Sequence, residues 1–92
     1  MAARRVNAIV EGVVQGVFFR ACTRDEGERL ALAGWVRNQP NGKVETEFEG
    51  EAREVERMIN WLHQGSPMSR VSKVTVIELT PSCTERDFTI TY

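Results

Sequence analysis

The chain is poor in the residues from which metal sites and nucleic-acid surfaces are built. It has one histidine and two cysteines, and its 12 basic residues do not outnumber its 13 acidic ones. Cys22 and Cys83 lie far apart and form no CxxC pair, so no zinc site and no other metal site is predicted. The formal net charge of −1 argues against a nucleic-acid partner, which would require a basic surplus. Free thiols are expected in a reducing compartment, although pairing of the two cysteines stays open.

Long hydrophobic runs are missing as well. The polar lead of residues 1–5 is followed by no apolar stretch that could act as a signal peptide or membrane span, so we predict a cytoplasmic protein with no membrane partner. There is no internal repeat, linker or low-complexity segment. With 92 residues, 41% of them hydrophobic, the chain is expected to form a single domain over residues 1–92, and a monomer is the default expectation.

Alternation and helical spacing predict seven secondary-structure elements. Strands are expected over residues 5–11, 35–38, 43–49, 70–79 and 87–92, and helices over 19–33 and 51–64. Gly34 is expected to end the first helix. In the third strand Val44 and Phe48 should face the core, and the alternating glutamates, Glu45, Glu47 and Glu49, should face water.

The predicted order is strand, helix, strand, strand, helix, strand, with one further short strand. This order favours an α/β (α+β) sandwich in which both helices cover one face of an antiparallel-rich sheet of four or five strands. It is the order of the ferredoxin-like split βαβ arrangement.

The run from Gly12 to Arg20 connects the first strand to the first helix. Backbone N–H groups that converge at such a turn can hold an anion, and an arginine adds a planar, permanently charged fork. A cation at a helix N-terminus is disfavoured by the helix dipole. The presence of Arg20 at this place therefore favours the interpretation that it binds an anion. The alternative is that the glycines serve only a tight turn and that Arg20 is solvated. The run is neither GxxxxGK[ST] nor GxGxxG, so it does not predict a nucleotide fold.

Asn38 ends the second strand just before a turn. Its amide can donate and accept hydrogen bonds, so it could orient a water molecule, although asparagine at this place also commonly initiates a turn. No acid–base pair is predicted, because His63 lies at a helix end and the carboxylates follow solvated faces. Cys22 is not expected to be a nucleophile, because cysteine phosphatases place the thiolate inside the loop and the arginine after it.

Two segments resemble the signature segments of the acylphosphatase family: Val10-x-Gly12-x-Val14-Gln15-Gly16-Val17-x-Phe19-Arg20 and Gly34-Trp35-Val36-Arg37-Asn38. The resemblance implies a ferredoxin-like fold and cofactor-free hydrolysis of a small-molecule acyl phosphate to a carboxylate and inorganic phosphate. It implies that Arg20 and Asn38 are catalytic. It also implies that phosphate is held by the backbone N–H groups of a loop formed by Gln15, Gly16, Val17, Phe18 and Phe19.

The chain departs from the family pattern at Gly27 and at Gly65-Ser66-Pro67, and neither departure is expected to touch the site. Two alternatives to a free-standing hydrolase remain. One is a non-enzymatic ferredoxin-like module that binds an anion or a protein. The other is a carbamoyl-phosphate-handling domain of a larger maturation system.

Overall fold

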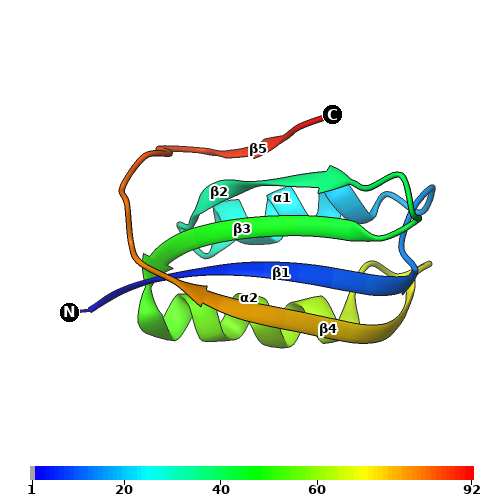
Figure 1. Cartoon of the computed structure of the whole chain (residues 1–92), viewed down its shortest axis with the longest axis horizontal. Coiled ribbons are helices and arrows are strands. Elements are labelled where there is room, and N and C mark those ends of the chain that lie inside the picture. The colour runs from blue at the N-terminus through cyan, green and yellow to red at the C-terminus, as the bar shows by residue number, and fades with distance from the viewer. Residues whose placement is uncertain (1) are drawn as a thin grey trace.

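The chain folds into one sheet covered by two helices. A computed structural model describes residues 2–92, and its elements are β1 (Ala3–Val13), α1 (Phe19–Arg29), β2 (Ala33–Asn38), β3 (Val44–Glu51), α2 (Ala52–Gln64), β4 (Arg70–Leu79) and β5 (Phe88–Ile90). The strand order is β4-β1-β3-β2-β5, with β2 and β5 parallel and the other neighbours antiparallel. Both helices lie on the same face of the sheet (Figure 1). The predicted ferredoxin-like α+β fold is therefore confirmed.

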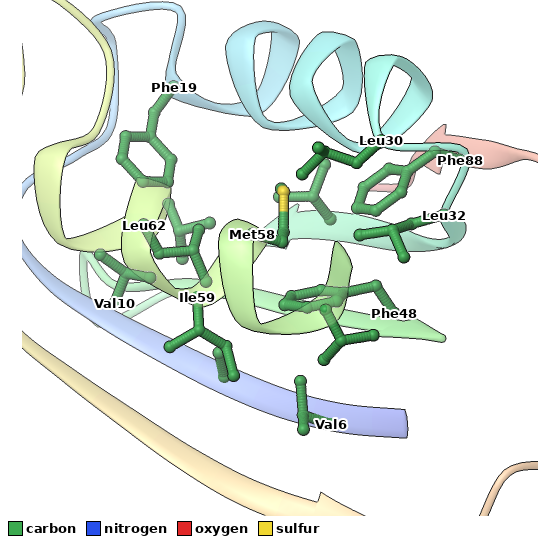
Figure 2. Close-up of a cluster of buried hydrophobic side chains, with 14 of the residues drawn as sticks. Val6, Val10, Phe19, Leu30, Leu32, Phe48, Met58, Ile59, Leu62 and Phe88 are labelled. Atoms are coloured by element: carbon green, nitrogen blue, oxygen red, sulfur yellow. The ribbon is translucent and has the colours of Figure 1, made fainter. Parts of the chain in front are cut away.

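The core lies between this face and the helices, as the alternation of apolar residues predicts. Val6 and Val10 of β1 and Phe48 of β3 point toward the buried stripe of α2, which Val55, Met58, Ile59 and Leu62 form (Figure 2). Burial of each large apolar side chain contributes about 1.5–3 kcal/mol to folding. The core continues to Phe19 at the start of α1 and so anchors one end of the loop that precedes this helix.

The first helix is shorter than predicted, and Gly34 is not its end. The helix stops at Arg29, and Ala31 turns the chain in a left-handed conformation with φ 58°. This reversal lets Leu30 and Leu32 both enter the core. Gly34 lies inside β2, where a Cβ atom would come within 2.0 Å of the Glu47 carbonyl oxygen.

Gly27, which is unfavourable inside a helix, has a packing role. A Cβ atom at this position would lie 2.3 Å from a ring carbon of Phe88. Figure 2 shows the Phe88 ring beside α1, next to Leu30 and Leu32. The glycine therefore lets β5 pack closely against the helix.

The prediction that the glutamates of the third strand all face water is wrong. Glu49 is only 8% exposed, and the buried guanidinium of Arg5 forms ion pairs with Glu47, Glu49 and Glu85. Hydrogen bonds from the backbone of Ser82 and from Arg5 hold the pKa of Glu49 below its usual range, and the hydrogen bond from Arg5 lowers the pKa of Glu85.

This cluster holds the long connection between the last two strands. β4 and β5 form opposite edges of the sheet, so residues 80–87 must cross its full width (Figure 1). Glu49 accepts hydrogen bonds from the backbone N–H groups of Ser82 (2.9 Å) and Cys83 (3.2 Å), while Glu85 reaches Arg5. The connection is thus tied to the centre of the sheet.

Both cysteines are free thiols. Neither helix of the described chain is long and apolar enough to span a membrane.

Candidate active site

The loop between β1 and α1 has a backbone shaped for an anion. Gly16 and Phe18 have positive φ angles of 73° and 59°. Such left-handed residues, alternating with right-handed or extended ones, turn successive N–H groups toward the same side of the chain. Among residues 2–92, no protein acceptor pairs with the backbone N–H groups of Gln15 to Phe19. These donors are free for a ligand at the positive end of α1.

A pocket of about 280 Å³ opens beside this loop. It is lined by Val14, Gly16, Phe18, Phe19, Arg20, Ala21, Asn38, Ile90 and Tyr92. Arg20 lies in the first turn of α1, which carries no acidic residue, and its guanidinium has no carboxylate partner within residues 2–92. Its central carbon lies 5.0 Å from the centroid of the Tyr92 ring. The pocket therefore holds a positive charge that no carboxylate of the described residues neutralises.

Asn38 reaches the same pocket from the end of β2. Its side-chain oxygen is buried and accepts no hydrogen bond from the rest of the described chain. An unpaired buried acceptor costs about 1–3 kcal/mol, and such groups commonly mark functional sites. The oxygen is suited to accept a hydrogen bond from a water molecule or a hydroxyl group inside the pocket.

The side chain of Gln15 joins the two halves of the site. Its Nε2 donates to the carbonyl oxygens of Gln39 and Lys43, both at 2.8 Å. The Gln39 N–H in turn donates to the Lys43 carbonyl at 2.8 Å, which closes the base of the turn between β2 and β3. Because Gln39 directly follows Asn38, Gln15 fixes the loop relative to the asparagine.

Ser66 supports the loop from the other side, contrary to the expectation that this departure would not touch the site. Its buried hydroxyl donates to the Val17 carbonyl oxygen at 3.1 Å, and Ser69 donates to the Ser66 carbonyl at 2.7 Å. Gly65, with φ 75°, brings this turn within close contact of Phe19. The segment after α2 thus packs directly beneath the loop.

The structure brings most of the predicted site residues into one pocket. Arg20, Asn38, Gly16, Phe18 and Phe19 line it. Two predicted loop residues have further roles: Gln15 reaches the neighbouring turn with its side chain, and Val17 packs against the core and accepts the Ser66 hydrogen bond.

Sequence reasoning missed two residues that contact the candidate site. Ser66 and Tyr92 join the site only through tertiary contacts, and a polar residue in a turn or an aromatic residue at the end of a strand gives no local signal of this. Cys22 lies outside the pocket, in a separate groove between α1 and the end of α2. Among residues 2–92, no three histidine, cysteine or acidic side chains are arranged to hold a metal ion.

Known proteins are similar to this chain in sequence and in fold. The family model described as Acylphosphatase matches residues 6–90. An acylphosphatase of Rubrobacter xylanophilus is 49% identical over 87 residues, which cover 95% of this chain and 79% of the relative. The crystal structure of an acylphosphatase from Bacillus subtilis superimposes with a TM-score of 0.93 at 35% identity, covering 97% of this chain and 99% of that one.

A similar fold also occurs inside a much longer protein. The crystal structure of HypF from T. kodakarensis matches with a TM-score of 0.83 at 26% identity, covering 97% of this chain but only 12% of that one. The family model and the relatives of similar length, taken together, identify the chain. It belongs to the acylphosphatase family and is an acyl phosphate hydrolase.

Proposed function

We propose that the loop of residues 15–19 and Arg20 bind the phosphoryl group of an acyl phosphate. This proposal is supported by a pocket lined by Arg20, which has no carboxylate partner within residues 2–92, and by the loop residues Gly16, Phe18 and Phe19, whose backbone N–H groups have no protein acceptor. Fixed donors need no reorganisation as charge develops on the phosphoryl oxygens, so they stabilise the transition state more than mobile water does. The guanidinium fork can donate to two phosphoryl oxygens at once.

Asn38 positions the attacking water in this proposal. Its unpaired oxygen accepts a hydrogen bond from the water, which keeps both protons at this point, and this hydrogen bond directs the water lone pair toward phosphorus. The new P–O bond forms as the bond from phosphorus to the acyl oxygen breaks, and the carboxylate leaves with the bonding electrons. The proton of the attacking water passes to a phosphate oxygen. Because a carboxylate is a good leaving group, no side-chain acid is required.

The experiment that tests the role of Arg20 measures release of inorganic phosphate from benzoyl phosphate. Arg20→Ala is expected to lower kcat/KM by about 10²-fold or more, and Arg20→Lys should recover little because it keeps the charge but loses the fork. Arg24→Ala, in the next turn of α1 and outside the pocket, is the matched control. Turnover near the wild-type level in both Arg20 variants would refute the assignment.

Asn38→Ala separates catalysis from binding. We expect turnover to fall by at least 10²-fold, while the affinity for inorganic phosphate, measured by calorimetric titration, stays within a factor of about 3. Loss of phosphate binding together with turnover would assign Asn38 a structural role instead.

The same assay separates the alternative functions. A non-enzymatic binding module would bind phosphate yet release none from benzoyl phosphate. Carbamoyl phosphate, assayed in parallel, tests whether this acyl group is also accepted.

A further inference from the structure

Two aromatic rings stand exposed at the mouth of the pocket. Phe18 is 82% exposed and Tyr92 is 96% exposed, and both line the pocket that contains Arg20 and Asn38. Single exposed apolar side chains are ordinary on a protein surface. Two large exposed rings at one pocket are less usual than a single one. Together they form an apolar surface that no other residue of the described chain covers.

The backbone at Phe18 adds to this argument. A phenylalanine with φ 59° is uncommon, since bulky side chains disfavour the left-handed region. Glycine or asparagine would satisfy the same turn at lower cost. The ring gains nothing from the core in return, because it points into solvent.

Tyr92 contacts Arg20 in a way that leaves the arginine free to bind phosphate. A guanidinium stacks through its flat face and donates hydrogen bonds through its edge. The Arg20 Cζ lies over the Tyr92 ring, 5.0 Å from its centroid, and a guanidinium held over a ring can still donate N–H groups to an anion beside it. The ring therefore lies next to a phosphoryl group held by Arg20.

The depth of the pocket gives the direction of the leaving group. The oxygen of Asn38 is buried, so the water that it holds lies at the inner end. In-line displacement requires the leaving group opposite the attacking water. The acyl group must therefore point outward, toward the exposed rings.

We propose that Phe18 and Tyr92 form the subsite for the acyl group and favour aromatic acyl phosphates over acetyl phosphate. This inference rests on the proposed function, because it takes the direction of the acyl group from the roles of Asn38 and Arg20. Stacking of an aromatic acyl group against either ring buries apolar surface that an acetyl group cannot cover.

The test is the ratio of kcat/KM for benzoyl phosphate to that for acetyl phosphate, compared between variants. Comparing variants with the wild type cancels the different intrinsic reactivities of the two substrates. Phe18→Asn retains a residue that tolerates the left-handed conformation, and Tyr92→Ser removes the other ring. Each is expected to lower the ratio by about 3- to 10-fold. Tyr92→Phe should keep the wild-type ratio.

Ile77→Ser is the matched control, because Ile77 is 55% exposed on β4 and lies outside the pocket. In this control, both the substrate ratio and the inhibition constant of inorganic phosphate should stay within about 2-fold of the wild-type values. An unchanged substrate ratio in both variants overturns the subsite. The subsite is also overturned if Tyr92→Ser loses phosphate affinity and lowers kcat/KM equally for both substrates. The Tyr92 ring would then act only by positioning Arg20. If the wild-type protein hydrolyses neither substrate, the proposed function fails as well; if it hydrolyses both and only the ratio is unmoved, the failure is confined to the subsite.

Discussion

Single residues at this site act mainly by holding other groups in place. In the proposed function, the side chains of Arg20 and Asn38 act on the substrate, whereas the remaining anion donors are backbone N–H groups. The positions of backbone N–H donors depend on the conformation of the loop that carries them. The hydrogen bonds that fix this loop therefore bear on catalysis although they do not touch the substrate.

Ser66 is the residue that tests this view. Ser66→Ala removes the hydrogen bond to the Val17 carbonyl and should lower the free energy of unfolding by about 1 kcal/mol. Because the loop becomes less ordered, we expect the inhibition constant of inorganic phosphate to rise by about 3-fold or more. The exposed Ser72→Ala on β4 serves as control. A lower Tm with unchanged phosphate affinity would limit Ser66 to stability.

The sequence predicts the groups that are proposed to bind the anion, but it does not predict the residues that hold these groups in place. Arg20 and the loop donors follow from a local pattern, since a strand, a glycine-containing turn and a helix start lie within one short segment. Ser66 is 49 positions from its partner Val17, and Tyr92 is opposite Arg20 only because β5 pairs with β2. Such contacts depend on the tertiary fold, which one sequence does not reveal residue by residue.

At the scale of secondary-structure elements, the site depends on how the loop after β1 meets the turn after β2. Gln15 is the direct link between them. Gln15→Leu keeps the approximate size of the side chain but removes both hydrogen bonds. We expect kcat to fall by about 10-fold, because a displaced Asn38 misplaces the water, while phosphate affinity changes less. Steady-state kinetics with phosphate as inhibitor measures both quantities.

Gln64→Leu, at the exposed end of α2, is the control for this substitution. A variant of Gln15 that loses phosphate affinity but keeps its kcat would contradict the linking role. That result would show that Gln15 shapes the anion loop alone.

The contact between α1 and β5 makes a second prediction. Alanine is a better helix former than glycine by about 1 kcal/mol, yet Gly27→Ala should destabilise the fold by about 2 kcal/mol because its methyl group meets the Phe88 ring. Denaturant unfolding measures the change. In the double variant with Phe88→Leu, the alanine should cost less than it does alone. A stabilised Gly27→Ala variant would show that β5 moves away easily.

Element types were predictable and some boundaries were not. The strand over 70–79 agrees with β4 at both ends, because residues 74–77 alternate between half-buried and exposed positions and a turn precedes the strand. The first helix was predicted four residues too long, since Leu30 and Leu32 continue an apolar pattern whose true cause is the reversal at Ala31. Periodicity does not distinguish a helix from a tight turn that buries the same side chains.

At the scale of the whole molecule, the cluster around Arg5 links the centre of the sheet to residues 80–87, which lead into β5 and Tyr92. The pKa values of Glu49 and Glu85 are lowered in the folded protein. Their contribution to stability is therefore complete above the usual glutamate pKa of about 4.3 and is lost as the pH falls through the lower folded-state values.

Glu49→Gln should consequently lower the free energy of unfolding at pH 7 by about 2 kcal/mol, because it removes one charge that pairs with the buried arginine. The difference in Tm from the wild type should narrow as the pH approaches 3, where the wild-type carboxylate is protonated too. Thermal unfolding at several pH values checks this. Glu28→Gln, exposed on α1, should show no such convergence. A difference that stays constant with pH would mean that the hydrogen bonds matter and the charge does not.

The position of β1 between β3 and β4 has a consequence for the order in which the chain is synthesised. β1 is synthesised before both of these partners, whose residues reach as far as Glu51 and Leu79. The anion loop follows β1 directly, and its supports at Lys43 and Ser66 also come later. A nascent chain halted before residue 66 should therefore show no affinity for phosphate, however long it is allowed to wait. The complete site therefore forms only late in synthesis, within a short stretch of the chain.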